Sequence, residues 1–297
     1  MNSYALWMIF SALVCAALYA FLARKTGKAL PLSVLTLLLG AALGTVLAKL
    51  VYYVAQLDFM IANGWLASLV ATDPAQWCFF GGAVGVGLGA YLAARLLKVK
   101  PAAALDAFAP AGALLAALVR FSAYFQQDAM IGLGEYMDNP ALCFFPLTVV
   151  NEWDEHYLAV FMLEALCALV VMVLSLTCFR KKTFVRTIFY LCLTQVFLES
   201  LHSGSLSWLF VRVEQLLSMI TLAVIILLYT LWMGRRRMRW VPMTICAACA
   251  GLFVGVEFAL DKTDWPIALI YGAMLLGLAV LAVTECRSFV LVEEKTE

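Results

Sequence analysis

Long uninterrupted runs of apolar residues dominate this sequence and decide what it can fold into. A run of about 20 apolar residues is the length that an α-helix needs to cross a bilayer. Strands of a membrane barrel would instead show about ten residues of alternating character. Of the 297 residues, 65% are hydrophobic and 13% are charged, whereas soluble domains carry roughly 25% charged residues. The chain is therefore predicted to be an all-α integral membrane protein, a polytopic helical bundle.

Nine segments have the length and composition of membrane-spanning helices. They are residues 4–23, 30–54, 77–97, 102–125, 157–178, 184–202, 209–233, 240–260 and 265–285. The longest stretch outside them, residues 126–156, carries six acidic residues and no lysine or arginine. Loops of this size are often functional. Residues 59–72 have the composition of a helix that lies on the membrane surface, with a plain loop as the alternative.

The basic residues predict the orientation of the bundle. Sixteen of the 20 follow the first, third, fifth, seventh and ninth segments: Arg24, Lys25, Lys28, Arg95, Lys98, Lys100, Arg180, Lys181, Lys182, Arg186, Arg235, Arg236, Arg237, Arg239, Arg287 and Lys295. Cytoplasmic loops are enriched in lysine and arginine. The amino terminus is therefore predicted to lie outside and the carboxyl terminus inside. The first segment does not resemble a cleaved signal peptide, because its charges follow the apolar run.

Composition also excludes several classes of function. A net charge of +1 argues against nucleic acid as a partner. The nine cysteines include one C-x-x-C pair, Cys246 and Cys249, which has no histidine or acidic residue close by in sequence, and only two histidines are present in the chain, which argues against a zinc site. No glycine-rich phosphate loop of the nucleotide-binding type occurs. Neither a metal nor an organic cofactor is expected.

Ionisable residues inside the predicted segments gather toward the outer half of the membrane. Lys49 and Arg120 lie about five residues from the outer ends of their segments, less than ~10 Å deep at a rise of about 1.5 Å per residue. Glu164 lies about two turns below the outer end of the fifth segment. Such residues are costly at membrane depth and are usually functional. Snorkelling to the interface is the alternative for Arg212 and Lys262.

Helical spacing places polar residues on two shared faces. Gln195, Glu199 and His202 are spaced i, i+4, i+7 on the sixth segment. The second face, at the end of the fourth segment, consists of Arg120, Tyr124 and Gln127, with Asp128 beside it. A buried ion pair between Arg120 and Glu199 or Glu164 is the purely structural alternative for these charges.

A stripe of small residues marks the third segment. Gly81, Gly85 and Gly89 recur every four residues, and Gly82 lies next to the outer end of the stripe. Such a stripe admits either a lipid or another helix at close range. Cations at shallow outer depth suit an anionic lipid headgroup. Transporters more often place their polar residues near the midplane, so the pattern favours lipid handling at the outer leaflet.

Short motifs run in order through the first four fifths of the chain. They are Ser3-Tyr4-Ala5-Leu6, Ala48-Lys49-Leu50, Phe80-Gly81-Gly82, Asp106-Ala107-Phe108-Ala109-Pro110 with Arg120 ten residues later, and Glu214-Gln215-Leu216-Leu217-Ser218. In this order and spacing they resemble the motifs of prolipoprotein diacylglyceryl transferase, a bacterial family of membrane enzymes. Lys49 stands where the family has arginine, and Phe80 where it has histidine. Gln195 and His202 stand where it has two further arginines.

The resemblance implies a reaction and its partners. Family members transfer a diacylglyceryl group from phosphatidylglycerol to the lipobox cysteine thiol of a prolipoprotein signal peptide. The reaction takes place at the outer leaflet of the bacterial cytoplasmic membrane. By this resemblance Arg120 binds the leaving phosphate, Glu199 or His202 is the base, and Asp128 orients Arg120. The residues expected to contact lipid or phosphate are Lys49, Gly81, Gly82, Tyr4, Tyr124, Gln195, Glu164 and Gln215.

The resemblance also divides the chain. Family members have seven spans, which correspond to residues 1–239, and residues 240–297 form an additional hairpin with a short cytoplasmic tail. Two other functions stay open. The chain is alternatively an inactive relative that binds lipid or lipoprotein, or a transporter of a small molecule or lipid.

Overall fold

In the computed structural model of the protein, the helices group into two compact units. The structure describes residues 3–63, 76–129, 131–151, 153–179, 181–208, 211–232, 240–263 and 265–296. Unit 1 consists of Met1–Leu191 and Leu201–Glu214, and unit 2 of Cys192–Ser200 and Gln215–Glu297. Each unit is described by itself below.

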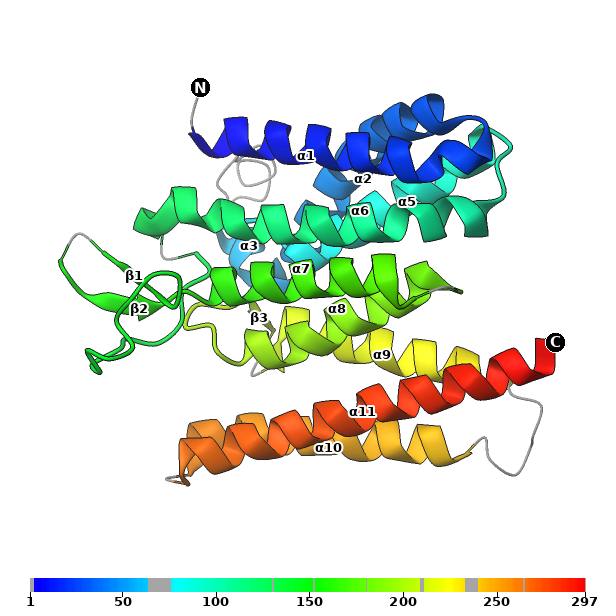
Figure 1. Ribbon diagram of the computed structural model, residues 1–297. Coiled ribbons are helices and arrows are strands. Elements are labelled where there is room, and N and C mark those ends of the chain that lie inside the picture. Colours follow the sequence, from blue (N-terminus) through cyan, green and yellow to red (C-terminus); the bar gives the residue numbers. More distant parts are fainter. Residues whose placement is uncertain are drawn as a thin grey trace. The chain divides into compact units, whose positions relative to one another are not determined.

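Unit 1 contains the amino-terminal helices and two small sheets. Its elements are α1 (Ser3–Leu22), η1 (Ala23–Thr26), α2 (Ala29–Ala55), α3 (Leu57–Asn63), α5 (Phe79–Leu96), α6 (Pro101–Phe121), η3 (Ser122–Ala129), β1 (Thr148–Val150), β2 (His156–Leu158), α7 (Val160–Thr177), β3 (Ser207–Trp208) and β4 (Val211–Arg212). The pairs β1–β2 and β3–β4 are antiparallel. The loops that carry β1 and β2 extend beyond the amino-terminal end of α7 (Figure 1).

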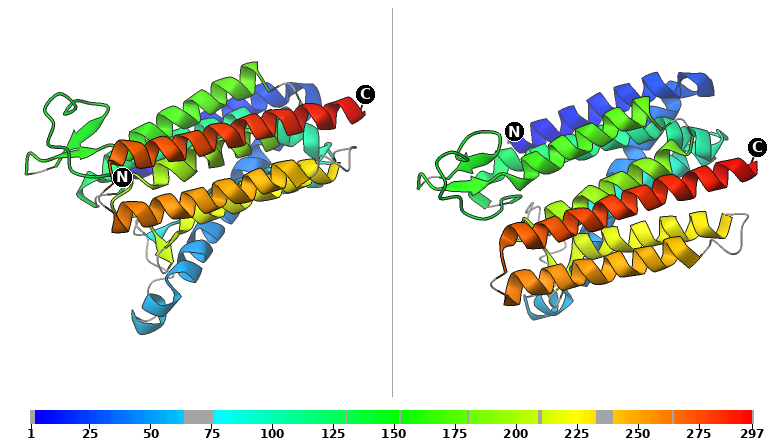
Figure 2. Two further views of the ribbon diagram at one scale, coloured as in Figure 1. Left: turned by 90° about the horizontal axis from the view of Figure 1, so that it is seen from below. Right: turned by 60° about the horizontal axis from the view of Figure 1, so that its bottom comes forward.

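Unit 2 is a group of helices from the last third of the chain. It holds the second half of α8 (Thr183–Glu199), nearly all of α9 (Val213–Trp232), α10 (Trp240–Lys262) and α11 (Ile267–Thr296). Helices α10 and α11 run side by side as a hairpin (Figure 2). The residues predicted to form an additional hairpin therefore form two paired helices.

Eight helices among the described residues are long and apolar enough to cross a membrane. They are Ser3–Thr26, Ala29–Ala55, Phe79–Leu96, Pro101–Gln126, Val160–Thr177, Val213–Trp232, Trp240–Leu260 and Ile267–Val292. The predicted sixth segment corresponds to α8, a helix of 17 residues. The prediction of a polytopic helical membrane protein is confirmed, with eight such helices in place of nine. The outward placement of the amino terminus stays a prediction.

Several predicted helix boundaries are wrong. The seventh predicted segment begins at residue 209, but residues 211–212 form β4 and α9 begins only at Val213; the ninth ends at residue 285, but α11 continues to Thr296. The sixth predicted segment runs to His202, but α8 ends at Glu199. The cause is the serine- and glycine-rich run that follows, because serine and glycine are poor helix formers. The fifth predicted segment begins at residue 157, but residues 156–158 form β2 and α7 begins only at Val160. Aromatic Tyr157 favours a strand here.

Some predictions fall partly outside the described residues. The surface helix predicted over residues 59–72 overlaps α3, Leu57–Asn63, while residues 64–75 lie outside the described part of the chain. Arg180 and the basic residues between 235 and 239, which belong to the predicted cytoplasmic clusters, also lie outside the described part of the chain.

The glycine stripe of α5 is the contact surface between α5 and α2. A Cβ atom at Gly85 would lie 2.4 Å from the Leu43 carbonyl oxygen, and one at Gly89 would lie 2.6 Å from the Gly40 nitrogen. A Cβ at Gly81 would lie 2.5 Å from the Leu47 carbonyl oxygen. These distances are shorter than real Cβ contacts, so the two backbones meet where side chains are absent. Helix packing therefore accounts for all three glycines.

Polar bonds and aromatic contacts join α1 to α6. The Trp7 indole donates to the Leu118 carbonyl at 2.8 Å, and the Tyr19 hydroxyl donates to the Ala104 carbonyl at 3.2 Å. Tyr19 is fully buried, and its ring meets that of Phe108 edge to face at 5.2 Å. Aromatic rings with a bonded polar tip are well suited to such a buried seam. The seam fixes α1 along α6.

Asp106 of α6 accepts a hydrogen bond from the first turn of α8. Its Oδ1 lies 2.9 Å from the Phe184 backbone nitrogen. Because the first N–H groups of a helix have no partner within the helix, the carboxylate acts as a cap. We expect Asp106→Ala to lower the free energy of unfolding by about 1–2 kcal/mol. The apparent Tm of purified protein in detergent measures this.

Asp106→Asn is the matched control for that prediction. It keeps an oxygen acceptor and removes the charge, so we expect a smaller loss than for alanine. An alanine variant with the Tm of the wild type would show that the bond adds no stability.

Candidate functional site

Arg120 is the centre of an ion-pair cluster in unit 1. It lies in the last turn of α6, where the helix dipole favours a cation. Its Nη2 lies 3.3 Å from Oε1 of Glu164 and 2.5 Å from Oε2 of Glu214. The guanidinium carbon also lies 3.8 Å from the centre of the Phe79 ring. The Arg120 side chain is 15% exposed, so these contacts are made largely away from solvent.

Glu214 brings the start of α5 into the same cluster. Its Oε1 accepts the backbone N–H groups of Phe79 at 2.9 Å and Phe80 at 3.4 Å. The Cys78 thiol donates to this oxygen at 3.6 Å. A carboxylate is stabilised at the N-terminus of a helix by the unpaired N–H groups and the dipole. One glutamate thus joins the beginning of α5 to the end of α6.

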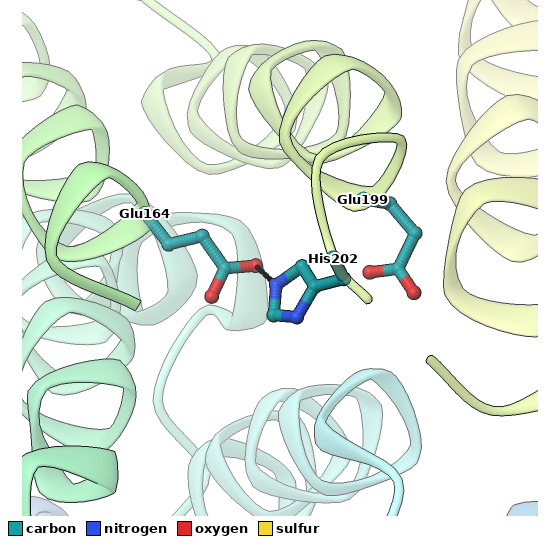
Figure 3. A group of neighbouring side chains, drawn as sticks. All are labelled: Glu164, Glu199 and His202. Carbon is teal, nitrogen blue, oxygen red and sulfur yellow. Dashed lines mark ion pairs between the residues drawn. The ribbon is translucent and has the colours of Figure 1, made fainter. Parts of the chain in front are cut away.

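His202 enters the cluster through Glu164. Its Nε2 lies 3.3 Å from Oε1 of Glu164 (Figure 3). The Glu164 side chain is 2% exposed. Because α8 ends at Glu199, His202 does not lie on the helical face that its spacing predicts. It lies instead in a turn, where its backbone pairs with Gly134.

The turn around His202 is tied to the long acidic loop. The Ser203 backbone nitrogen donates to the Leu133 carbonyl at 3.1 Å. Arg212 donates from Nη1 to the His202 carbonyl at 2.7 Å, so this arginine has a structural partner. A Cβ at Gly134 would lie 2.6 Å from the Leu201 carbonyl oxygen, which explains glycine at this close approach. The loop therefore holds the backbone from which the imidazole projects.

Tyr157, at the end of this loop, has a perturbed pKa. The Tyr157 hydroxyl donates to Oε2 of Glu155 at 3.1 Å. This hydrogen bond to a carboxylate raises the pKa of Tyr157 above its ordinary value. Tyr157 therefore stays a neutral donor at and above neutral pH.

Lys49 meets the segment that leads into α5. It is buried at 7% exposure; its Nζ donates to Gln76 Oε1 at 3.4 Å and lies 4.8 Å from the centre of the Trp77 ring. The predicted cation on α2 thus contacts the two residues that precede Cys78, next to the end of α5 that binds Glu214.

Aromatic side chains surround the end of α6. The Trp7 ring of α1 lies 5.1 Å from that of Phe121 and 5.5 Å from that of Phe125. Tyr124 stacks on Phe121 at 5.7 Å and is 41% exposed. Tyr4 lies beside the Ser122 hydroxyl. These rings cover the helix end that carries Arg120.

The face predicted for Arg120, Tyr124 and Gln127 is not a continuous α-helical face. α6 ends at Phe121, and η3 continues as a 3-10 helix with non-helical dihedral angles at Gln126. The positions three and four apart therefore do not keep the α-helical register. The side chain of Asp128 lies outside the described part of the structure, so its role in orienting Arg120 stays a prediction.

Three further predicted residues belong to unit 2. On α8, Gln195 donates to Oε2 of Glu199 at 2.9 Å. On α9, Gln215 donates to the Val196 carbonyl at 3.3 Å and to Oε1 of Glu257 at 2.8 Å. Glu257 comes from α10, so the hairpin supplies a partner to a predicted lipid-binding residue.

Two participants were not identified from the sequence. Glu214 appears there only within the motif at residues 214–218, and Glu257 lies in the eighth predicted segment without an assigned role. Their rarity at membrane depth is a signal that could have singled them out. Their partners depend on which helices are neighbours, and a single sequence does not give that.

The cluster combines an anion-binding group with groups that exchange protons. A guanidinium binds phosphate oxygens in a fixed fork geometry. The carboxylates accept protons, and an imidazole beside a carboxylate is a common general base. With both carboxylates ionised, Arg120, Glu164 and Glu214 together carry one excess negative charge. Proton transfer and phosphate binding are therefore both within reach of these residues.

Unit 1 thus combines membrane-spanning helices with a largely buried arginine–carboxylate cluster, and the class of protein is a multi-pass helical membrane protein. The family model for prolipoprotein diacylglyceryl transferase matches residues 1–231. The chain belongs to this family, whose members are transferases in lipoprotein biosynthesis. Comparisons with curated proteins and with solved structures found no match. The matched residues end before α10 begins at Trp240, so the α10–α11 hairpin lies outside the match.

Proposed function

We propose that this protein transfers a diacylglyceryl group from phosphatidylglycerol to the lipobox cysteine thiol of a prolipoprotein. The reaction takes place at the outer leaflet of the bacterial cytoplasmic membrane. The observation that carries the proposal is the position of Arg120, a largely buried cation beside two carboxylates and a histidine. Membership of the family supports the same reaction.

The chemistry assigns a task to each group. The cysteine sulfur attacks the glyceryl carbon, the bond from that carbon to the phosphate oxygen breaks, and glycerol phosphate leaves. Arg120, helped by Lys49, stabilises the charge that grows on the leaving phosphate. A free thiol has a pKa of about 8.5 and needs a base to react at neutral pH.

We assign the base to His202 or to Glu199. The contact between His202 and Glu164 supports the histidine, because a carboxylate orients the imidazole and stabilises the imidazolium that forms. No resident metal or organic cofactor takes part in this proposal.

A second candidate function rests on the ion pairs themselves. Arg120 contacts both Glu164 and Glu214, which is the structural pairing expected of a relative that binds lipid or lipoprotein without reacting. Such a protein would bind phosphatidylglycerol or the signal peptide and form no thioether.

Incubation of purified protein with phosphatidylglycerol and a lipobox peptide separates the two candidates. We expect the peptide to gain the mass of one diacylglyceryl group, and a peptide with serine in place of cysteine to stay unchanged. Binding of the lipid without any mass gain, by protein shown to be folded, would support the non-catalytic relative and overturn the transferase.

A further inference from the structure

Four groups converge on the carboxylate of Glu214. Oε2 accepts from Arg120, and Oε1 accepts from the backbone of Phe79 and Phe80 and from the Cys78 thiol. Glu214 itself is buried, with 7% of its surface exposed. Both oxygens of this carboxylate are therefore held in a fixed place.

The same donors are those that bind a phosphate group. Guanidinium groups and the N-terminal N–H groups of helices are recurrent partners of phosphate oxygens. Two adjacent N–H groups at the start of α5 and the Nη2 of Arg120 point at one anion, and that anion is a side chain of the protein itself. A lipid phosphate that binds Arg120 must compete for donors that are already used.

Charge makes this competition stronger. A phosphodiester that approaches Arg120 also approaches Glu164 and Glu214, and like charges in a poorly hydrated place repel. Movement of Glu214 away from Arg120 would release the donors and remove one of these negative charges at the same time. Movement of Glu164 would release its contacts with Arg120 and His202 but would leave the donors at Glu214 occupied.

We infer that Glu214 is a specificity-determining residue, an internal anion that holds the phosphate position at Arg120 and the start of α5 until the lipid phosphate displaces it. The inference rests on the proposed function, because it takes the anionic headgroup of phosphatidylglycerol as the ligand. Only an anionic lipid that binds strongly enough to displace Glu214 then reaches Arg120.

Titration of a short-chain phosphatidylglycerol into purified protein in a neutral detergent tests the inference. We expect Glu214→Gln to bind dihexanoyl-phosphatidylglycerol about tenfold more tightly than the wild type, since a charge-assisted bond no longer competes. Glu164→Gln is the matched control, because it removes a carboxylate from Arg120 and leaves the donors at Glu214 occupied. Loss of this charge relieves repulsion of the phosphate without releasing those donors, so we expect a gain in affinity of no more than about threefold.

Two further ligands separate the possible sources of binding. Dihexanoylglycerol lacks the phosphate, so its binding should be the same in Glu214→Gln and in the wild type. Glycerol phosphate lacks the acyl chains. If Glu214→Gln also binds glycerol phosphate more tightly than the wild type, the position takes free phosphate in addition to lipid. Displacement is supported whether the gain occurs with both phosphate ligands or with the phospholipid alone. A gain with dihexanoylglycerol of the same size as with the phospholipid would overturn it.

Equal or weaker binding of the phospholipid by Glu214→Gln would also overturn the inference, as would an equal gain in Glu164→Gln. If Glu214→Gln does not fold, Glu214→Asp provides the test. It keeps the charge but is shorter by one methylene, so it should bind at least about twofold more tightly, and equal or weaker binding would contradict displacement. Binding is read without turnover. A missing thioether product therefore overturns the proposed function alone, and an unchanged titration overturns the inference alone.

Discussion

Arg120→Ala is expected to reduce the initial rate of thioether formation at least 100-fold. Removal of one group that stabilises developing charge costs about 10²–10³ in rate in comparable sites. Arg120 is the cation that contacts both Glu164 and Glu214. The alanine variant therefore also removes the positive charge of Arg120 from beside two buried carboxylates. We expect a loss of stability of about 3–5 kcal/mol from that cause. Rate by mass spectrometry and the apparent Tm should both be measured.

Arg120→Lys separates the loss of catalysis from the loss of stability. Lysine keeps the positive charge next to the carboxylates but lacks the planar fork of donors. We expect a folded protein whose rate is reduced at least about tenfold. A folded Arg120→Ala protein that keeps more than a tenth of the wild-type rate would contradict the role of Arg120 in binding phosphate.

Gly85→Leu is expected to lower the free energy of unfolding by about 3 kcal/mol or more. The first side-chain atom alone would lie 2.4 Å from the Leu43 carbonyl oxygen and 2.6 Å from the backbone of Gly44. Overpacking of a close contact typically costs 1–3 kcal/mol, and more where backbone must move. We expect the apparent Tm in detergent to fall by about 6–12 °C.

Gly87→Leu is the matched control on the same helix. A Cβ at Gly87 would lie 3.6 Å from the far end of the flexible Phe184 side chain, which is an ordinary contact. We expect this variant to melt within a few degrees of the wild type. Equal losses at both positions would show that α5 tolerates no leucine anywhere, and would refute the specific packing of α5 on α2.

The class of fold was predictable from the sequence because membrane-spanning helices leave a strong local signal. The apolar runs of α1, α2 and α9 are long enough to identify one by one. The end of α8 was harder to place, because the polar residues beyond Glu199 continue the helical spacing while serine and glycine end the helix. Spacing alone therefore put His202 on a face that does not exist.

The site was predictable only where a residue is unusual by itself. Arg120 and Glu164 are rare charges at membrane depth, and their pairing was among the alternatives that the sequence left open. Glu214 was not identified as their partner, because its contacts depend on which residues lie beside the start of α5 and the end of α6. The glycines gave a clear stripe, but the structure was needed to show that α2 covers it.

Following both products of the lipid, the diacylglyceryl group on the peptide and the released glycerol phosphate, tests the central claim most directly. Phosphatidylglycerol labelled in its headgroup glycerol should be incubated with the folded wild-type protein and a lipobox peptide. We predict labelled glycerol phosphate and thioether peptide in a ratio of about one to one, with neither formed when the peptide is left out. Labelled glycerol phosphate released without thioether, or neither product from folded protein beside an active control enzyme, would contradict the account.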